Sequence, residues 1–197
     1  SMGGHTAWSY ALAHQERLDG LVLVDASGWP KTGDEAESSP LVFKLLANPV
    51  ARRVMKDIDM TGLIRSGLED SFADPALVTD TMVERYSALS RAPCHREAIL
   101  NLMTDRDDRS DASVEKLAAI NVPTLIMQGE KDNLVPAAHA EKFHTAIAGS
   151  ELKLYPDVGH LPQEEAAAQS VGDLRNFLST QVYIVSDEAL PEPFPAE

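Results

Sequence analysis

Three residues of the chain have the types that nucleophilic catalysis needs. Ser1 opens the sequence, Asp132 follows Gly-Glu-Lys, and His160 follows Asp-Val-Gly. A serine hydroxyl is a weak nucleophile until a base removes its proton, and an imidazole can do so because it titrates near neutral pH. A carboxylate would hold that imidazole in the required tautomer and stabilise its cation. The residues therefore predict a triad with Ser1 as nucleophile, His160 as base and Asp132 as acid.

The residues after Ser1 predict how a nucleophile would be presented. Gly3 has no Cβ to clash in a tight turn, and Gly4 would let a following helix pack close to a strand. Backbone N–H groups at a helix N-terminus stabilise negative charge. We therefore expect the N–H of Met2 to be one donor to the oxyanion of a tetrahedral intermediate.

Asp25 is a second candidate for the acid of the triad. It ends the apolar run of residues 21–24. The other interpretation is a turn or capping residue, since Asp is common at such positions. Asp157, three residues before His160, is most simply a turn acid as well. Both interpretations of Asp25 stay open at this point.

Short apolar runs predict the sheet that would position these side chains. Residues 21–24 and 124–127 are apolar without alternation, apart from Thr124 at one end, as in strands buried on both faces of a parallel sheet. Over residues 151–155 charged and apolar residues alternate, as in an edge strand. A fourth run, residues 181–185, is either a strand or a segment packed loosely after a helix.

Helical patterns lie between these runs, over residues 6–14, 137–147 and 162–178. The last pattern is the clearest, because it carries an apolar stripe. The stripe consists of Val171, Leu174, Phe177 and Leu178. Helices that alternate with buried strands predict an α/β fold with a mostly parallel sheet and right-handed crossovers.

A long insert separates the first two predicted strands. A crossover needs only roughly a dozen residues, so residues 30–113 exceed that need, and we interpret them as a helical cap. The core then comprises residues 1–29 and 114–185. Residues 186–197 contain three prolines and four acids and predict a disordered acidic tail. The helical patterns of the insert cover residues 41–47, 50–58, 75–89 and 96–103.

Composition excludes several classes of function. The chain has 17 Lys and Arg against 31 Asp and Glu, a net charge of −14, which argues against nucleic acids and anionic membranes as partners. No apolar run approaches the roughly 18 residues of a membrane-spanning helix. One cysteine, Cys94, permits neither an internal disulfide nor a Cys-based zinc site, and the acidic segments lack calcium-loop spacing, so we expect no metal. A lone cysteine and no visible signal peptide favour a cytoplasmic location, and a homodimer is left open.

Several segments resemble the capped α/β-hydrolase family. They are Ser-Met-Gly-Gly followed by Ala-Trp-x-Tyr-Ala-Leu-Ala-His, then Leu-Val-Leu-Val-Asp-Ala-Ser-Gly, Val-Pro-Thr-Leu-Ile-x-x-Gly-Glu-x-Asp-x-Leu-Val-Pro and Val-Gly-His-x-Pro-x-x-Glu. The resemblance covers residues 1–29 and 114–179. It implies the triad and the Met2 donor named above, and no metal or organic cofactor. Its Gly-Glu-x-Asp pattern favours Asp132 over Asp25 as the acid.

The sequence departs from this family in three places. Of the Gly-x-Ser-x-Gly elbow only the part from Ser1 to Gly3 is present, so we expect roughly 80 to 100 residues upstream, with the elbow strand and a second oxyanion donor. The sheet would accordingly be an incomplete α/β-hydrolase sheet made of its C-terminal strands. Leu161 stands where many carbon–carbon hydrolases have an aromatic residue. A serine nucleophile argues against the dehalogenases and epoxide hydrolases of this fold, which use aspartate.

These observations predict a serine hydrolase that acts on a small, partly apolar, ester-like substrate through an acyl-enzyme. One alternative is a hydrolase of carbon–carbon bonds in ring-cleavage products. Others are an N-terminal-nucleophile hydrolase, in which the amino group of Ser1 is the base, and an inactive fragment. The candidate pocket residues are Trp29, Phe43, Leu134, Val135 and Leu161.

Overall fold

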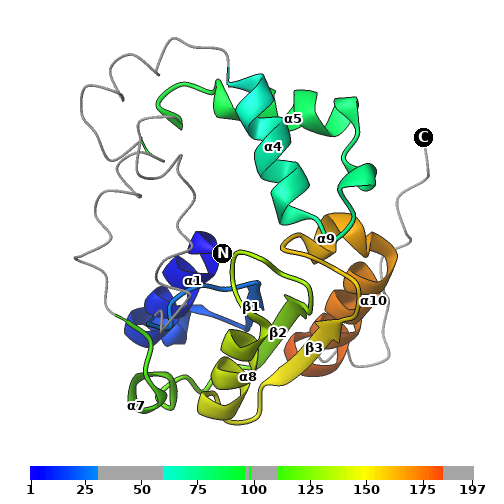
Figure 1. Ribbon diagram of the computed structural model, residues 1–197. Helices are drawn as coiled ribbons and strands as arrows, with labels where there is room; N and C mark the ends of the chain where they lie inside the picture. Colours follow the sequence, from blue (N-terminus) through cyan, green and yellow to red (C-terminus); the bar gives the residue numbers. More distant parts are fainter. Residues whose placement is uncertain (31–59, 96–97, 99–110, 184–197) are drawn as a thin grey trace.

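Three parallel strands, β1, β2 and β3, form a sheet in that order (Figure 1). The computed structural model describes residues 1–30, 60–95, 98 and 111–183. All of β2 is buried, whereas β3 is the margin of the described sheet and is mostly half-buried. The unalternating run of β2 thus corresponds to a central strand and the alternating run of β3 to an edge strand, as predicted. By contrast, β1, which was also predicted to be buried on both faces, lies at the other margin of the described sheet and alternates between buried and half-buried residues. The strands span Leu21–Val24, Thr124–Gly129 and Glu151–Tyr155.

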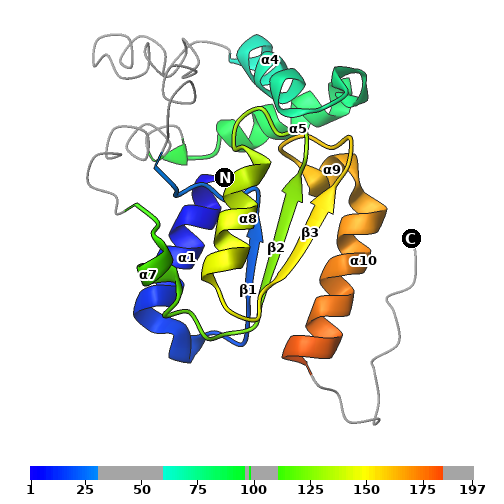
Figure 2. The same cartoon turned by 60° about the horizontal axis from the view of Figure 1, so that its bottom comes forward.

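Helices cover both faces of this sheet (Figure 2). On one face, Ile126 of β2 packs in a cluster with Trp8 of α1 and Phe143 of α8. On the other face, Leu125 of β2 packs with Phe177 of α10. Both faces of the central strand are therefore covered by packed apolar side chains, which explains why its sequence is apolar without alternation. These helices are α1 (Met2–His14), α8 (Ala137–Ala146) and α10 (Ala167–Phe177).

The three predicted core helices are present, but the last differs in detail. It is two helices, α9 (Pro162–Glu165) and α10, because the backbone of Ala166 leaves the helical region. Val171 is 43% exposed, so its place in the predicted apolar stripe is wrong. A π-helical turn (Leu178–Val182) follows α10, so the start of the fourth apolar run is not a strand. Residues 184 and 185 lie outside the described residues.

Two further helices, α4 (Thr61–Ser71) and α5 (Asp80–Ser90), lie above the carboxyl ends of the strands (Figures 1 and 2). They pack on one another through Leu68, Phe72 and Val83, which are buried together. The helical pattern predicted over residues 75–89 corresponds to a 3₁₀ turn (Pro75–Leu77) and α5. The assignment of residues 30–113 to a cap domain stays a prediction. The patterns at 41–47 and 50–58 and most of that at 96–103 lie outside the described residues, as does the tail.

Short elements complete the connections. They are a 3₁₀ turn (Gln15–Arg17) after α1 and the helix α7 (Val114–Leu117) before β2. Within the described part of the chain, no helix has both the length and the apolar character that crossing a membrane requires.

Candidate active site

The loops after β2 and β3 approach each other closely at Gly129. A Cβ at this position would overlap the carbonyl oxygens of Gly159 and Val158, so only glycine allows the approach. The N–H of Lys131 donates to the carbonyl of Val158 at 2.9 Å and joins the two loops. Asp132 and His160, which are 28 residues apart in the sequence, are thereby brought into contact.

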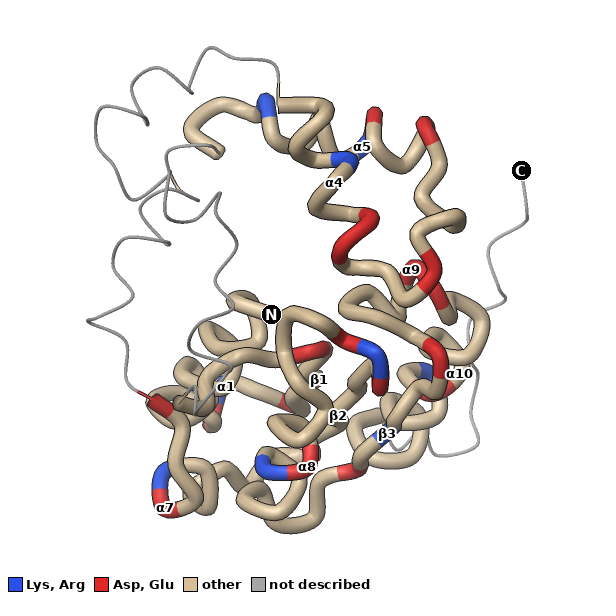
Figure 3. Tube along the Cα trace, in the orientation of Figure 1, with Lys and Arg blue, Asp and Glu red and all other residues tan. Residues whose placement is uncertain are grey.

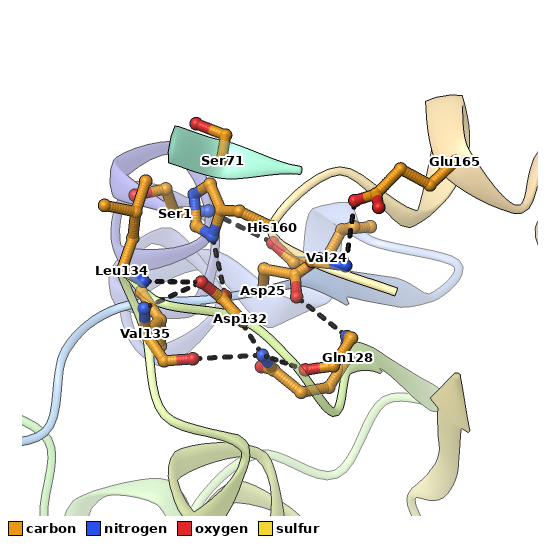
Figure 4. Close-up of polar contacts among 12 residues, drawn as sticks. Ser1, Val24, Asp25, Ser71, Gln128, Asp132, Leu134, Val135, His160 and Glu165 are labelled. Atoms are coloured by element: carbon orange, nitrogen blue, oxygen red, sulfur yellow. Dashed lines mark hydrogen bonds and ion pairs between the residues drawn. The ribbon is translucent and has the colours of Figure 1, made fainter. Parts of the chain in front are cut away.

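A short hydrogen bond joins His160 to Asp132. Nδ1 of His160 lies 2.7 Å from Oδ2 of Asp132, and both residues are buried (Figure 4). Oδ1 of Asp132 accepts the backbone N–H groups of Leu134 at 2.7 Å and Val135 at 3.0 Å. Nε2 of Gln128 donates to Oδ2 at 3.1 Å. The carboxylate is therefore fixed from several sides and holds the imidazole by its Nδ1 edge.

The surroundings of Asp132 favour its ionised form. Burial raises the pKa of this carboxyl, but the hydrogen bond and charge of His160, together with the amides of Val135 and Leu134, outweigh burial and lower it below the ordinary value. A carboxylate that stays ionised can stabilise an imidazolium next to it.

Ser1 is fixed at the carboxyl end of β1, at the start of α1. Its amino group donates to the carbonyl of Val24 at 3.1 Å, and its own carbonyl accepts the N–H of Ser27 at 3.1 Å. Ser1 lies next to His160 (Figure 4). In the described part of the chain, no hydrogen bond joins the Ser1 hydroxyl to His160. The structure thus gathers all three predicted triad residues at one edge of the sheet.

The turn after Ser1 corresponds to the prediction at Gly4 but not at Gly3. A Cβ on Gly4 would lie 2.5 Å from Cβ of Ala26, so glycine lets α1 approach the end of β1. A Cβ on Gly3 meets no described atom within 4 Å, so the described residues do not support its predicted steric role. Met2 is the first residue of α1, and its N–H belongs to the free donors of a helix N-terminus.

Asp25, the second candidate acid, is buried in the same site but does not bind the histidine. Its Oδ1 accepts the N–H of Gly129 at 3.0 Å, and its Oδ2 has no partner among the described residues. Burial, with a smaller contribution from the charge of Asp132, raises the pKa of Asp25 to about 8, against the hydrogen bond from Gly129. The sequence interpretation as a turn residue fits its left-handed backbone, with φ of 43°, but did not anticipate its burial beside Asp132 and His160.

Asp25, Asp132 and His160 also have the spacing of metal ligands. One ligand atom from each residue lies within 4.8 Å of the others. The Nδ1 of His160 is already engaged by Asp132, and the expected absence of a metal stays a prediction.

The candidate pocket residues are in different surroundings. Leu134, which is 38% exposed, follows Asp132 closely, whereas Val135 is buried. Leu161 packs against the cluster between α4 and α5. Trp29 packs edge-on against Phe143 of α8, with 5.5 Å between ring centroids, and therefore belongs to the core layer of α8. Phe43 lies outside the described residues.

Comparisons with known proteins place this chain in a family. The sequence model of the family described as serine aminopeptidase, S33, matches residues 1–167. A 2-hydroxy-6-oxononadienedioate/2-hydroxy-6-oxononatrienedioate hydrolase of Comamonas testosteroni is 30% identical over 172 residues, which are 85% of this chain and 56% of that protein. The chain thus spans little more than half the length of this relative.

Solved structures share the fold. A serine hydrolase involved in carbazole degradation has a TM-score of 0.70 at 22% identity, over 91% of this chain and 61% of that one. A thermophilic esterase from Thermogutta terrifontis has a TM-score of 0.67 at 23% identity, over 93% of this chain and 64% of that one. At these identities the likeness concerns the α/β-hydrolase fold alone.

Proposed function

The chain belongs to the serine aminopeptidase (S33) family of α/β hydrolases, and from this premise we propose that Ser1, His160 and Asp132 are the catalytic triad of a serine hydrolase. The observation that carries the proposal is the 2.7 Å contact between Nδ1 of His160 and Oδ2 of Asp132, which leaves Nε2 of the ring as the atom that can serve a nucleophile. An acid fixed by two backbone amides is the orienting group that such a base needs.

In the proposed reaction, Oγ of Ser1 attacks the carbonyl carbon of an ester while Nε2 of His160 takes the hydroxyl proton. The carbonyl oxygen becomes an oxyanion, and the N–H of Met2 at the positive end of α1 donates to it. The intermediate collapses, and the alcohol leaves with the proton from His160. Water, deprotonated by His160, then attacks the acyl carbon. The second intermediate collapses, Oγ of Ser1 leaves and takes the proton back from His160, and the carboxylic acid is released. Asp132 stays ionised throughout and stabilises the imidazolium in both steps.

We infer a small, partly apolar carboxylic ester as the substrate. Leu134 supports this inference, because it offers apolar surface two residues from the triad acid and is partly exposed. The helices α4 and α5, which lie over the carboxyl ends of the strands, support an enclosed site (Figure 1). The triad itself requires no cofactor.

A carbon–carbon hydrolase is the second candidate, and the relatives favour it. The Comamonas testosteroni relative is named as a hydrolase of an oxo-substituted dienedioate or trienedioate and not of an ester. In the carbon–carbon reaction the leaving group is carbon, and it would take the proton that an alcohol oxygen takes in the ester reaction. Leu161, in place of the aromatic residue expected after the histidine, is the feature of this chain that weighs against it.

The test begins with the mass and N-terminal sequence of the native gene product, which is the protein to assay. We expect a fluorophosphonate probe to label Ser1 and short acyl esters to be hydrolysed. Ser1→Ala should abolish labelling and lower kcat by roughly 10³-fold or more. Ser66→Ala, on an exposed position of α4, is the matched control and should change neither.

Two results would contradict the proposal. Labelling and turnover that persist in Ser1→Ala would exclude Ser1 as the nucleophile. Intact esters together with cleavage of a vinylogous diketone acid, lost in Ser1→Ala, would keep the triad and replace the ester reaction by the carbon–carbon reaction.

A further inference from the structure

The helix α9 lies between the histidine loop and the helices above the sheet (Figure 1). It begins two residues after His160 and ends at Glu165. Neither Glu165 nor its neighbour Glu164 has a part in the triad chemistry. Both side chains nevertheless bind groups outside α9, and they bind different ones.

Glu165 uses each carboxylate oxygen for a separate backbone amide. Oε1 accepts the N–H of Gly159 at 2.8 Å, and Oε2 accepts the N–H of Ala73 at 2.8 Å. Gly159 directly precedes His160, whereas Ala73 directly follows Phe72 beyond the end of α4 and is 92 residues away from Glu165 in the sequence. One side chain therefore ties the histidine loop to the end of a helix above the sheet.

Two further contacts join the histidine loop to the end of α4. The N–H of His160 itself donates to the carbonyl of Ser71, the last residue of α4, at 2.7 Å. A Cβ on Gly159 would overlap the carbonyl of Ser71 and lie 2.7 Å from the nitrogen of Ala73. The two backbones approach so closely that only glycine fits at position 159. The carboxylate of Glu165 accepts an amide from each backbone and holds the two together.

The side chain of Glu164 binds the helix α5 rather than the end of α4 or the histidine loop. Its Oε1 lies 2.7 Å from Nη2 of Arg85 and 3.2 Å from the hydroxyl of Tyr86, both on α5. The two adjacent glutamates thus make two different attachments, which can be tested separately. One of them attaches α9 to α5, and the other attaches the histidine loop to the end of α4.

We propose that Glu165 is a positioning residue for His160, and that through it the segment from Ser71 to Ala73 sets the orientation of the catalytic imidazole. The inference rests on the proposed role of His160 as the base. Asp132 fixes the ring only at Nδ1, so the placement of Nε2 toward Ser1 depends on the backbone of residues 159 and 160. That backbone is fixed by Glu165 and by the carbonyl of Ser71. A displacement of about 1 Å at a catalytic group costs roughly 100-fold in rate.

The test compares Glu165→Ala and Glu165→Gln with Glu164→Gln in the native gene product. Each is assayed for kcat and KM, for thermal unfolding, and for the NMR signal of the His160 Nδ1 proton in the hydrogen bond to Asp132. We expect Glu165→Ala to lower kcat roughly 10- to 100-fold with KM within about threefold, and to shift or broaden the His160 signal. Glu165→Gln keeps one acceptor oxygen but faces one amide with an NH₂ group, so its values should lie between those of the wild type and Glu165→Ala.

The control should show the opposite combination. Glu164→Gln keeps the His160 signal and kcat and changes only the melting temperature, because Arg85 and Tyr86 do not touch the histidine loop. The inference is overturned if Glu165→Ala and Glu165→Gln lower only the melting temperature while kcat and the His160 signal stay as in the wild type. If Ser1→Ala retains full activity, the proposed function falls, and the His160 signal alone then decides the role of Glu165.

Discussion

At the scale of single residues, the site contains two buried carboxyl groups that are held in different protonation states. Asp132 receives hydrogen bonds from His160 and two backbone amides, which lower its pKa. Asp25 receives one, from Gly129, and has a second oxygen without a described partner. Burial therefore dominates at Asp25 and raises its pKa to about 8. Both carboxyl groups are buried, so the number of hydrogen bonds that each one accepts decides which of them stays ionised.

The raised pKa of Asp25 predicts a pH dependence of stability. The folded state keeps the proton up to about pH 8, whereas the unfolded state loses it near the ordinary value of 3.8. Folding takes up one proton in this window, so the free energy of unfolding should fall by about 1.4 kcal/mol per pH unit from this group alone as pH rises from 5 to 7.5. The contribution is fully present below pH 3.8 and is lost as pH approaches 8.

The measurement is urea unfolding of the wild type and Asp25→Asn across this range. Asparagine does not titrate in either the folded or the unfolded state. The free energy of unfolding of the variant should therefore lack the fall with pH that Asp25 contributes. The difference between the two curves, wild type minus variant, should decrease steadily between pH 5 and 7.5. Parallel curves would mean that Asp25 is ionised in the folded protein.

At the scale of elements, the junction between α1 and β1 depends on one of two adjacent glycines. A Cβ on Gly4 would lie 2.5 Å from Cβ and 2.8 Å from Cα of Ala26, and a Cβ on Gly3 would meet no described atom within 4 Å. Gly4→Ala should therefore destabilise by about 1–3 kcal/mol, because α1 must move away from β1. Gly3→Ala should be neutral or stabilise by up to about 1 kcal/mol, since alanine favours the helix.

Chemical denaturation of both variants checks this prediction, and Gly3→Ala serves as the matched control on the same helix. Equal losses in the two variants would show that the amino end of α1 tolerates no added Cβ for a reason other than contact with Ala26.

The elements that could be predicted from the sequence are those specified by local patterns. The strands β1 and β2 are apolar runs, and α8 has an apolar face, so neighbouring residues carry the signal. The helix α4 escaped prediction because Gly62 and Gly67 weaken its helical pattern. The break between α9 and α10 could not be predicted, because it falls at Ala166 and no proline or glycine lies at that position.

The site could be predicted only where a residue's own type carries the role. The triad order indicated Ser1, Asp132 and His160, and the structure gathers them. Glu165 is the glutamate of the segment Val-Gly-His-x-Pro-x-x-Glu, so the sequence marked its position. It did not reveal the contacts of Glu165, because the second partner, Ala73, is 92 residues away. The burial of Asp25 was hidden as well, because an aspartate after a strand has the same sequence signature in a turn and in a buried site.

At the scale of the whole molecule, the net charge of −14 affects stability through two opposing terms. Acidic residues occur both on the helices above the sheet and around the sheet itself (Figure 3), so their repulsion favours expansion of the chain. Ion pairs act in the other direction. Those of the described residues include Arg65 with Asp80 and Lys131 with Asp157. At least one side chain of each pair is largely exposed, and such pairs contribute only about 0–1 kcal/mol each.

Salt should therefore stabilise the protein at pH 7. Raising NaCl from 10 to 200 mM shortens the screening length from roughly 30 Å to below about 10 Å and weakens the long-range repulsion among the excess acidic groups more than it weakens contacts between paired charges. We expect the free energy of unfolding to rise by about 0.5–1 kcal/mol. Urea unfolding at matched ionic strengths of NaCl and KCl measures it, and equal effects of the two salts identify screening. A fall in stability with added salt would mean that the exposed ion pairs outweigh the repulsion.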